Sequence, residues 1–246
     1  MGVGEVLGEA WKLYTKFFVR FFVIAIIVFA IVNLLNALIV ALVGHGSGIR
    51  ALLTLVTLII SIVGSFWLQG ALVYAVDDVR DGKIDATVGQ VFDRVRPHLG
   101  TLILAGILAG LGIAVGFVFL IVPGLILLTW WCLIVPAIVL EGKSVGESFG
   151  RSRELVRGHA WTVLGVIVLT GLMIAVAAGI LNAIFSFLGP FLRTWIGGSI
   201  SSAVVGPFFA VALTLMYFKL RDLKEPAAAA PVAPAEPAPA DTKPQW

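Results

Sequence analysis

Six long apolar runs constrain this chain more than any other feature of its sequence. Several of them exceed the roughly 20 residues that an α-helix needs to cross a hydrocarbon layer of about 30 Å. Hydrophobic residues make up 60% of the chain and its mean hydropathy is +1.06, which is typical of proteins that cross a membrane several times. The sequence therefore predicts an all-α membrane protein with six transmembrane helices, at about residues 20–43, 51–76, 99–122, 124–140, 161–186 and 195–218.

A short pattern recurs before each pair of apolar runs. Residues 87–92 (TVGQVF) return as residues 144–149 (SVGESF), and a looser copy, GVGEVL, occupies residues 2–7. Each copy places a residue suited to a helix N-cap three positions before Glu or Gln, and in the second and third copies this is the pattern of a capping box. Apolar and charged residues then alternate with a helical period. The pattern predicts three short amphipathic helices that lie in the membrane interface.

This pattern divides the predicted membrane domain, residues 1–224, into three units. The units cover about residues 2–80, 81–140 and 141–224, and each contains one amphipathic helix and two transmembrane helices. Every unit begins and ends on the same side of the membrane, so the repeats are parallel and related by an axis along the membrane normal. We expect three helical hairpins in a rough three-fold arrangement, each preceded by an amphipathic helix on the cytoplasmic side. Val122, Pro123 and Gly124 predict the turn of the middle hairpin.

The end of the chain has a different composition. Six of the eleven prolines lie in the last 22 residues, mixed with alanine. Such a segment cannot bury an apolar face, so residues 225–246 are predicted to form a disordered cytoplasmic tail. The tail is solvated on the simplest interpretation. The alternative is that it docks a membrane or cytoplasmic protein partner.

The distribution of charge predicts the orientation in the membrane. Of the 17 Lys and Arg residues, only Arg50 and Arg193 fall on the side opposite to the two termini, and all 14 Asp and Glu residues fall on the side of the termini. Basic residues accumulate in cytoplasmic loops, so both termini are predicted to be cytoplasmic. The sequence pI near 9.2 then reflects membrane topology, and we predict no nucleic-acid partner.

Residues that could carry catalysis or hold a metal are sparse. The interiors of the six runs contain no Asp, Glu, Lys, Arg or His. Cys132 has no histidine in its run, and His45, His98 and His159 fall in loops or at interfaces. A nucleophile needs a base beside it, and a metal site needs clustered ligands. We therefore predict no enzyme activity, no cofactor and no metal site.

Polar residues inside the runs leave two interpretations open. Asn33 and Asn36 share one helix face, and Asn182 lies in the fifth run. Hydrogen bonds between helices would account for all three. The alternative is a polar cavity lined by these amides.

A collar of basic residues lies within a turn or two of the predicted cytoplasmic interface. Each such residue adds about 1 kcal/mol of attraction to an anionic leaflet. The collar needs no binding site to explain it, because basic residues accumulate on the cytoplasmic side and their long side chains reach the interface. The functional interpretation is contact with lipid headgroups or phosphate, for which Arg151 and Arg157 are the leading candidates. The collar contains Arg94, Arg96, Arg151, Arg153 and Arg157, with Lys12 and Lys16 beside them.

Three segments resemble one known family. They are residues 121–126 (IVPGLI), 139–142 (VLEG) and 151–161 (RSRELVRGHAW). Over roughly residues 3–224 the chain is similar to the membrane domain attached to some bacterial glycerophosphoryl diester phosphodiesterases, and to related six-helix bacterial membrane proteins of unknown function. In those diesterases a separate soluble barrel carries the chemistry, and no part of this chain can form it. The resemblance implies a multipass domain in a bacterial plasma membrane and no hydrolase activity.

Two functional hypotheses follow. The first is a non-enzymatic module of the bacterial plasma membrane that organises partner proteins or lipids of the anionic inner leaflet through the basic collar. The alternative is a small transporter or channel for an uncharged or lipid-like substrate, which would pass between the three hairpins.

Overall fold

The computed structural model describes residues 2–42, 48–80 and 82–225, and these residues form helices and no strand. Within them, six helical segments are long and apolar enough to cross a membrane, which confirms the predicted fold class at this level. Residues 226–246 of the predicted tail and His45 lie outside the described residues. The six segments are Phe18–Ala41, Ala51–Val79, Val88–Phe119, Ile121–Glu141, Ala160–Phe187 and Pro190–Lys224.

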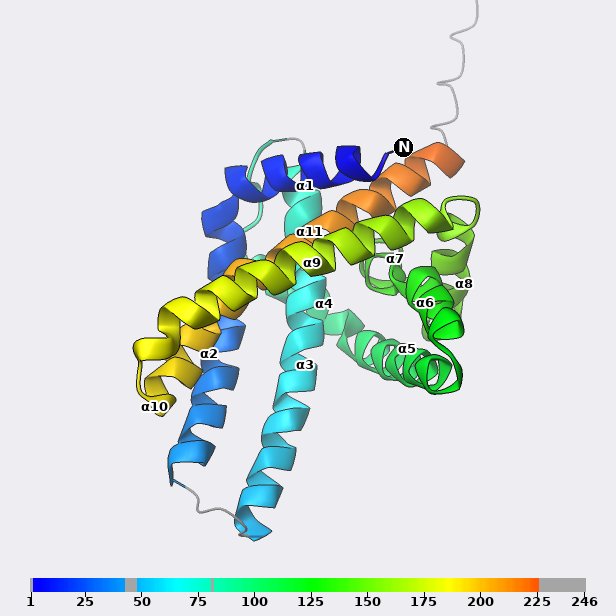
Figure 1. Ribbon diagram of the computed structural model, residues 1–246. Helices are drawn as coiled ribbons and strands as arrows, with labels where there is room; N and C mark the ends of the chain where they lie inside the picture. The colour runs from blue at the N-terminus through cyan, green and yellow to red at the C-terminus, as the bar shows by residue number, and fades with distance from the viewer. Residues whose placement is uncertain (1, 43–47, 81, 226–246) are drawn as a thin grey trace, which may run out of the picture.

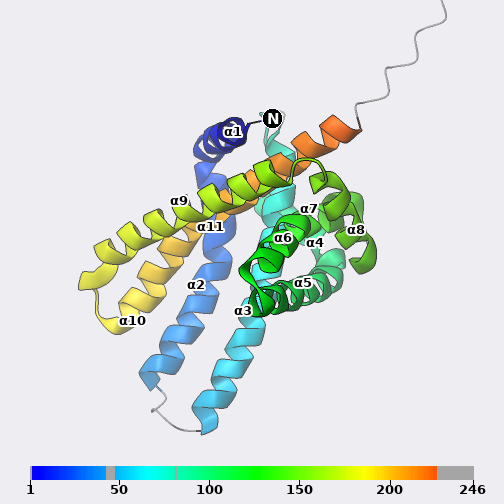
Figure 2. The ribbon, with the colours of Figure 1, turned by 45° about the vertical axis from the view of Figure 1, so that its right-hand side comes forward.

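Consecutive long helices pack against each other in three pairs, and the first and third pairs also pack against one another (Figures 1 and 2). The first pair is α2 (Phe18–Leu42) with α3 (Gly48–Val79), and the second is α5 (Leu99–Phe119) with α6 (Ile121–Trp131). The third is α9 (Ala160–Ile184) with α11 (Gly198–Lys224), joined through α10 (Pro190–Leu192) and a π-helical stretch at Arg193–Gly197.

The three pairs do not contribute equally to the core. Helix α11 packs against α2, α3 and α9, and its buried side chains include Val211, Ala212, Met216 and Tyr217. The other long helices leave most of their apolar side chains on the outer surface, as expected for helices that face lipid. Helix α11 is therefore the centre of the molecule, and the repeat and its three-fold arrangement stay predictions.

Three short helices begin at the recurring pattern: α1 (Val3–Lys16), α4 (Val88–Val95) and α8 (Val145–Val156). The Thr87 amide donates to Gln90 Oε1 at 2.8 Å, and the Gln90 amide donates to Thr87 Oγ1 at 3.3 Å. The Ser144 amide donates to Glu147 Oε2 at 2.9 Å. These bonds satisfy amide groups that have no partner within the helix, and they fix where α4 and α8 begin.

The fourth apolar segment differs from the prediction in two ways. Its turn lies at Leu120, which is extended (φ −164°, ψ 152°), so the predicted turn at Val122, Pro123 and Gly124 was wrong. Pro123 instead lies in the first turn of α6, where a helix loses no hydrogen bond to proline. The segment is also interrupted after Trp131 and resumes as α7 (Ile134–Glu141). Pro136 accounts for the interruption, because it has no amide to bond the preceding turn.

The break in the fourth segment is held by a side chain from α8. The Ser152 hydroxyl donates to the Trp130 carbonyl at 2.6 Å and accepts from the Leu133 amide at 3.1 Å. Ser152 is completely buried. A single hydroxyl therefore satisfies two backbone groups that the interrupted helix leaves without partners.

Glycines on α5 allow close approach of its neighbours. A Cβ at Gly106 would lie 1.9 Å from the Phe66 ring on α3, and one at Gly112 would lie 2.5 Å from the Trp131 ring. Gly116 packs against the Gly124 backbone of α6, where a Cβ would approach to 3.0 Å. Gly110 faces open space. Gly106, Gly112 and Gly116 are thus packing positions, whereas Gly110 is not.

Replacing Gly106 by Ala should destabilise the protein by about 1–3 kcal/mol, because the Phe66 ring must leave its position to make room. Gly110→Ala is the matched control on the same helix. It should be neutral or stabilising by up to about 1 kcal/mol, since alanine favours helix and meets no atom there. Thermal unfolding of both variants in the same detergent measures the difference, and equal effects would contradict the packing role of Gly106.

Candidate anion-binding surface

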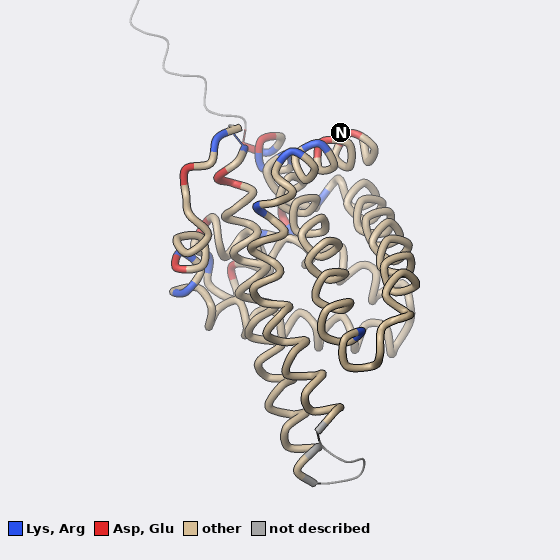
Figure 3. Tube along the Cα trace, turned by 90° about the vertical axis from the view of Figure 1, so that its left-hand side faces the viewer, with Lys and Arg blue, Asp and Glu red and all other residues tan. Residues whose placement is uncertain are grey.

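Most charged residues lie at one end of the chain trace and on the side next to it (Figure 3). We call this region the charged end; it consists of α1, the C-terminal turns of α3 and α11, and the short helices α4 and α8. The middle turns of α2 and α3 carry no charge. The charged end therefore contains the residues from which any anion-binding site must be built.

A groove of about 430 Å³ lies between α1 and α11 at the charged end. Leu13, Leu215 and Phe218 form its apolar part. Four cationic and two acidic side chains also line it, namely Lys12, Lys16, Arg80, Lys219, Glu9 and Asp222. We call this site the α1–α11 groove.

The cations of the α1–α11 groove differ in how they are held. Lys219 is paired with Glu5 at 2.7 Å and with Glu9 at 2.8 Å, and its hydrogen bond lowers the pKa of Glu5. The Arg80 guanidinium lies over the Phe218 ring, 3.7 Å from its centre. Within the described part of the chain, Lys12, Lys16 and Arg80 form no ion pair. Three positive charges are thus available to an anion.

A second recess, of about 550 Å³, lies beside α8. It is lined by Trp130, Gly150, Arg153, Glu154 and Arg157, and we call it the α8 recess. The Arg153 guanidinium lies 4.5 Å from the centre of the Trp130 ring. Neither Arg153 nor Arg157 has an ion-pair partner among residues 2–42, 48–80 and 82–225. Two of the arginines predicted to contact headgroups therefore share one recess.

The α8 recess lies in the part of the chain that matches a known protein family. The model of a family described as a domain of unknown function, DUF7847, matches residues 70–220. The chain belongs to the DUF7847 family. No curated protein and no solved structure matches the chain. The DUF7847 region begins inside α3 and contains the α8 recess, whereas Lys12 and Lys16 precede it. No function is attached to DUF7847, so the resemblance to phosphodiesterase membrane domains stays a prediction.

Arg151, which also lies on α8, is held by carboxylates. It bonds Glu141 at 2.9 Å, Glu225 at 2.7 Å and Glu154 at 3.4 Å. The Tyr217 hydroxyl donates to the same Glu141 carboxylate. Partial burial disfavours the charged form of Arg151, but its bonds to Glu141 and Glu225 raise its pKa above the ordinary value. Arg151 thus joins α7, α8 and the end of α11, and its donors are occupied by protein.

The two remaining arginines predicted to contact headgroups lie outside the α1–α11 groove and the α8 recess. Arg94 on α4 and Arg96 in the following turn are exposed at the charged end, but they line neither the α1–α11 groove nor the α8 recess. They provide a natural comparison for the groove cations, because they carry the same charge at the same end of the molecule.

The asparagines predicted to line a polar cavity are placed as follows. The Asn36 amide donates to the Val32 carbonyl at 3.0 Å and the Asn182 amide to the Ala178 carbonyl at 2.9 Å, so both bond their own helices. Asn33 lies beside Gly198. None of these three asparagines lines the cavity of about 350 Å³ among the long helices.

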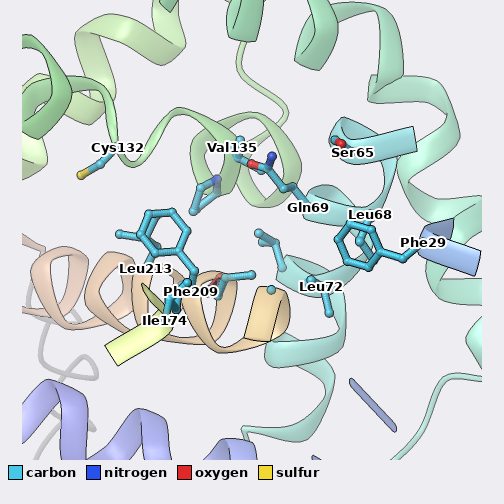
Figure 4. A pocket seen from close by; sticks show the side chains of 15 residues that line it. Phe29, Ser65, Leu68, Gln69, Leu72, Cys132, Val135, Ile174, Phe209 and Leu213 are labelled. Carbon is cyan, nitrogen blue, oxygen red and sulfur yellow. Dashed lines mark hydrogen bonds between the residues drawn. The ribbon is translucent and has the colours of Figure 1, made fainter. Parts of the chain in front are cut away.

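That cavity, of about 350 Å³, lies between the first helix pair, the third helix pair and α7 (Figure 4). Residues of α2, α3, α7, α9 and α11 line it, together with Cys132, which directly follows α6. Its walls are mainly apolar, and the polar side chains among them belong to Ser65, Gln69, Cys132 and Thr214. Sequence reasoning did not identify this site, because its lining comes from five helices that no local pattern connects.

The sequence patterns also did not predict an ion pair that joins α2 and α3. Arg20 Nη2 lies 2.6 Å from Asp78 Oδ2, and the two side chains are only 8% and 6% exposed. Asp78 also accepts from the Ala86 amide at 3.1 Å, which ties the loop after α3 to the bundle. The sequence contained a signal: Arg20 and Asp78 lie at adjoining ends of two consecutive apolar runs.

Among the described residues, no three His, Cys, Asp or Glu side chains form a group that could hold a metal ion.

Proposed function

We propose that this protein is a non-enzymatic module of the bacterial plasma membrane that binds the headgroups of anionic lipids at its charged end. In this proposal both termini and the charged end face the cytoplasm, and α1, α4 and α8 lie near the inner leaflet. The observation that carries the proposal is the α1–α11 groove, where Lys12, Lys16 and Arg80 converge without ion-pair partners. The α8 recess, with Arg153 and Arg157, is the second contact.

Topology alone requires cationic residues on this side, but it does not require them to meet in a groove. A cation that only snorkels keeps its own hydration and needs no neighbour of the same sign. The four cationic side chains of the groove outnumber its two carboxylates, and the excess positive charge would be offset by a bound anion. A lipid phosphate supplies that anion, with its acyl chains directed toward the apolar surface of the helices. The resemblance to membrane domains attached to bacterial glycerophosphoryl diester phosphodiesterases agrees with a lipid-facing role.

Replacing Lys12 and Lys16 by Gln should weaken binding of phosphatidylglycerol by about 30-fold. Each lysine contributes about 1 kcal/mol, and 1.4 kcal/mol corresponds to a tenfold change in affinity. Neither side chain has an ion pair within the described ranges, so the variant should fold. The measurement is a titration of the purified protein with phosphatidylglycerol, followed by mass spectrometry of the intact complexes.

Arg94→Gln with Arg96→Gln is the matched control, since it removes the same two charges outside the groove. It should keep most of the affinity. Equal losses for the two double variants would show that only the total charge matters, and the groove would then not be a site. Phosphatidylcholine, titrated in parallel, should bind all forms weakly.

A second candidate function is a small transporter or channel for an uncharged or lipid-like substrate. The cavity of about 350 Å³ between the first and third helix pairs favours it, because it offers space for such a substrate among the long helices. A partner protein bound through the tail would be compatible with either function.

A further inference from the structure

The cavity between the helix pairs has the size and shape of a ligand site. Its volume of about 350 Å³ falls in the range of about 300–1,000 Å³ that is typical of small-molecule pockets. Phe29 of α2, Ile174 of α9 and Phe209 of α11 contribute apolar walls from three different helices (Figure 4). An apolar molecule would therefore be enclosed from several sides.

Two polar side chains of α3 face this apolar space. Ser65 and Gln69 lie one helical turn apart, and both line the cavity (Figure 4). Neither has a hydrogen-bond partner among the described residues, and Gln69 is an exposed side chain. The other polar members are satisfied locally: Thr214 donates to the Ala210 carbonyl at 2.7 Å, and Cys132 contacts the Thr129 carbonyl at 3.2 Å.

The depth of Ser65 and Gln69 makes their lack of partners costly. Both lie well inside the apolar segment Ala51–Val79, far from either end. An amide without a partner in hydrocarbon costs several kcal/mol, because no water is present to bond it. A molecule in the cavity that carries a hydrogen-bonding group would satisfy these two side chains of α3.

The lining also limits the chemistry of that molecule. No charged side chain lines the cavity, so a charged group would remain uncompensated inside it. The occupant must combine an apolar body with one uncharged polar group. We propose that the cavity binds a neutral lipid whose hydroxyl or ester group pairs with Gln69 and Ser65. This site is independent of headgroup binding at the charged end.

The first test uses the unaltered protein in nanodiscs of phosphatidylcholine, so that anionic lipid plays no part. The probe is hexadecanol that carries a photoreactive diazirine on its chain. Labelling should fall on peptides that contain residues 65–73 and 206–214, and unlabelled hexadecanol should compete at least fivefold better than hexadecane. Absence of label on these peptides, or equal competition by the alkane, would overturn the proposal.

Variants then separate the polar group from the apolar volume. Gln69→Leu keeps the volume and removes the amide, so labelling should fall about fivefold, as expected for loss of one hydrogen bond. Ala210→Phe fills the cavity and should reduce labelling to background. Asn182→Leu makes the same amide-to-leucine change on α9, outside the cavity, and should leave labelling unchanged. Equal labelling of Gln69→Leu and Asn182→Leu proteins would contradict the role of Gln69.

Discussion

Replacing Asp78 by Asn should destabilise the protein by about 3–5 kcal/mol, the loss expected when one partner of a buried ion pair is removed. Asparagine still accepts the Ala86 amide, but it leaves the Arg20 guanidinium buried without a negative charge. The Arg20 Nε atom already lacks a hydrogen-bond partner, so the arginine has no second acceptor on which to rely. Thermal unfolding in detergent, followed by circular dichroism, measures the loss.

The neighbouring Asp77 provides the control for this effect. Asp77 is exposed and belongs to the same turn of α3, so Asp77→Asn should change stability by less than about 1 kcal/mol. A double variant, Arg20→Met with Asp78→Leu, removes both charges and should recover most of the loss. Equal destabilisation by Asp77→Asn and Asp78→Asn would show that the buried pair has no special role.

Replacing Glu141 by Gln should have the second largest effect, a loss of about 2–3 kcal/mol. Glu141 receives Arg151 Nε at 2.9 Å and the Tyr217 hydroxyl, and hydrogen bonds to a charged group are worth about 1.5–3 kcal/mol. The variant weakens the only carboxylate that joins α7, α8 and α11 among the residues described. Destabilisation should be strongest in α8, where hydrogen exchange of the amides should become faster.

Glu154 is the matched comparison for Glu141. It contacts the same arginine at 3.4 Å, but its side chain is 65% exposed. Solvent screens such a pair, so Glu154→Gln should cost at most about 0.5 kcal/mol. If both substitutions had the same small effect, Arg151 would not be a structural joint, and it would again be a candidate for headgroup contact.

The elements that could be predicted from sequence are those set by local chemistry. The six apolar runs predicted six membrane-length segments, because crossing hydrocarbon demands both length and apolar composition. Thr87 and Ser144 predicted where α4 and α8 begin, because a capping box depends on residues three positions apart. Pro123 misled the prediction, since proline suits the first turn of a helix as well as a hairpin turn.

The candidate sites depended on contacts between distant segments, which local patterns do not contain. Lys12 and Lys16 were recognised as basic residues near an interface, but Arg80, which completes the groove, comes from the end of α3. Arg151 was grouped with Arg157 because both lie on the polar face of one helix. Their difference comes from Glu141 and Glu225, which reach α8 only in the folded chain.

The central claim, that the α1–α11 groove selects anionic headgroups, is tested most directly in a bilayer. Spin-labelled phosphatidylglycerol and phosphatidylcholine report, by electron paramagnetic resonance, the fraction of each lipid held at the protein. The account predicts that the unaltered protein and the Arg94→Gln, Arg96→Gln variant hold phosphatidylglycerol in clear preference, and that Lys12→Gln with Lys16→Gln abolishes this preference. Equal retention of the two lipids by the unaltered protein, or an unchanged preference in the lysine variant, would contradict it.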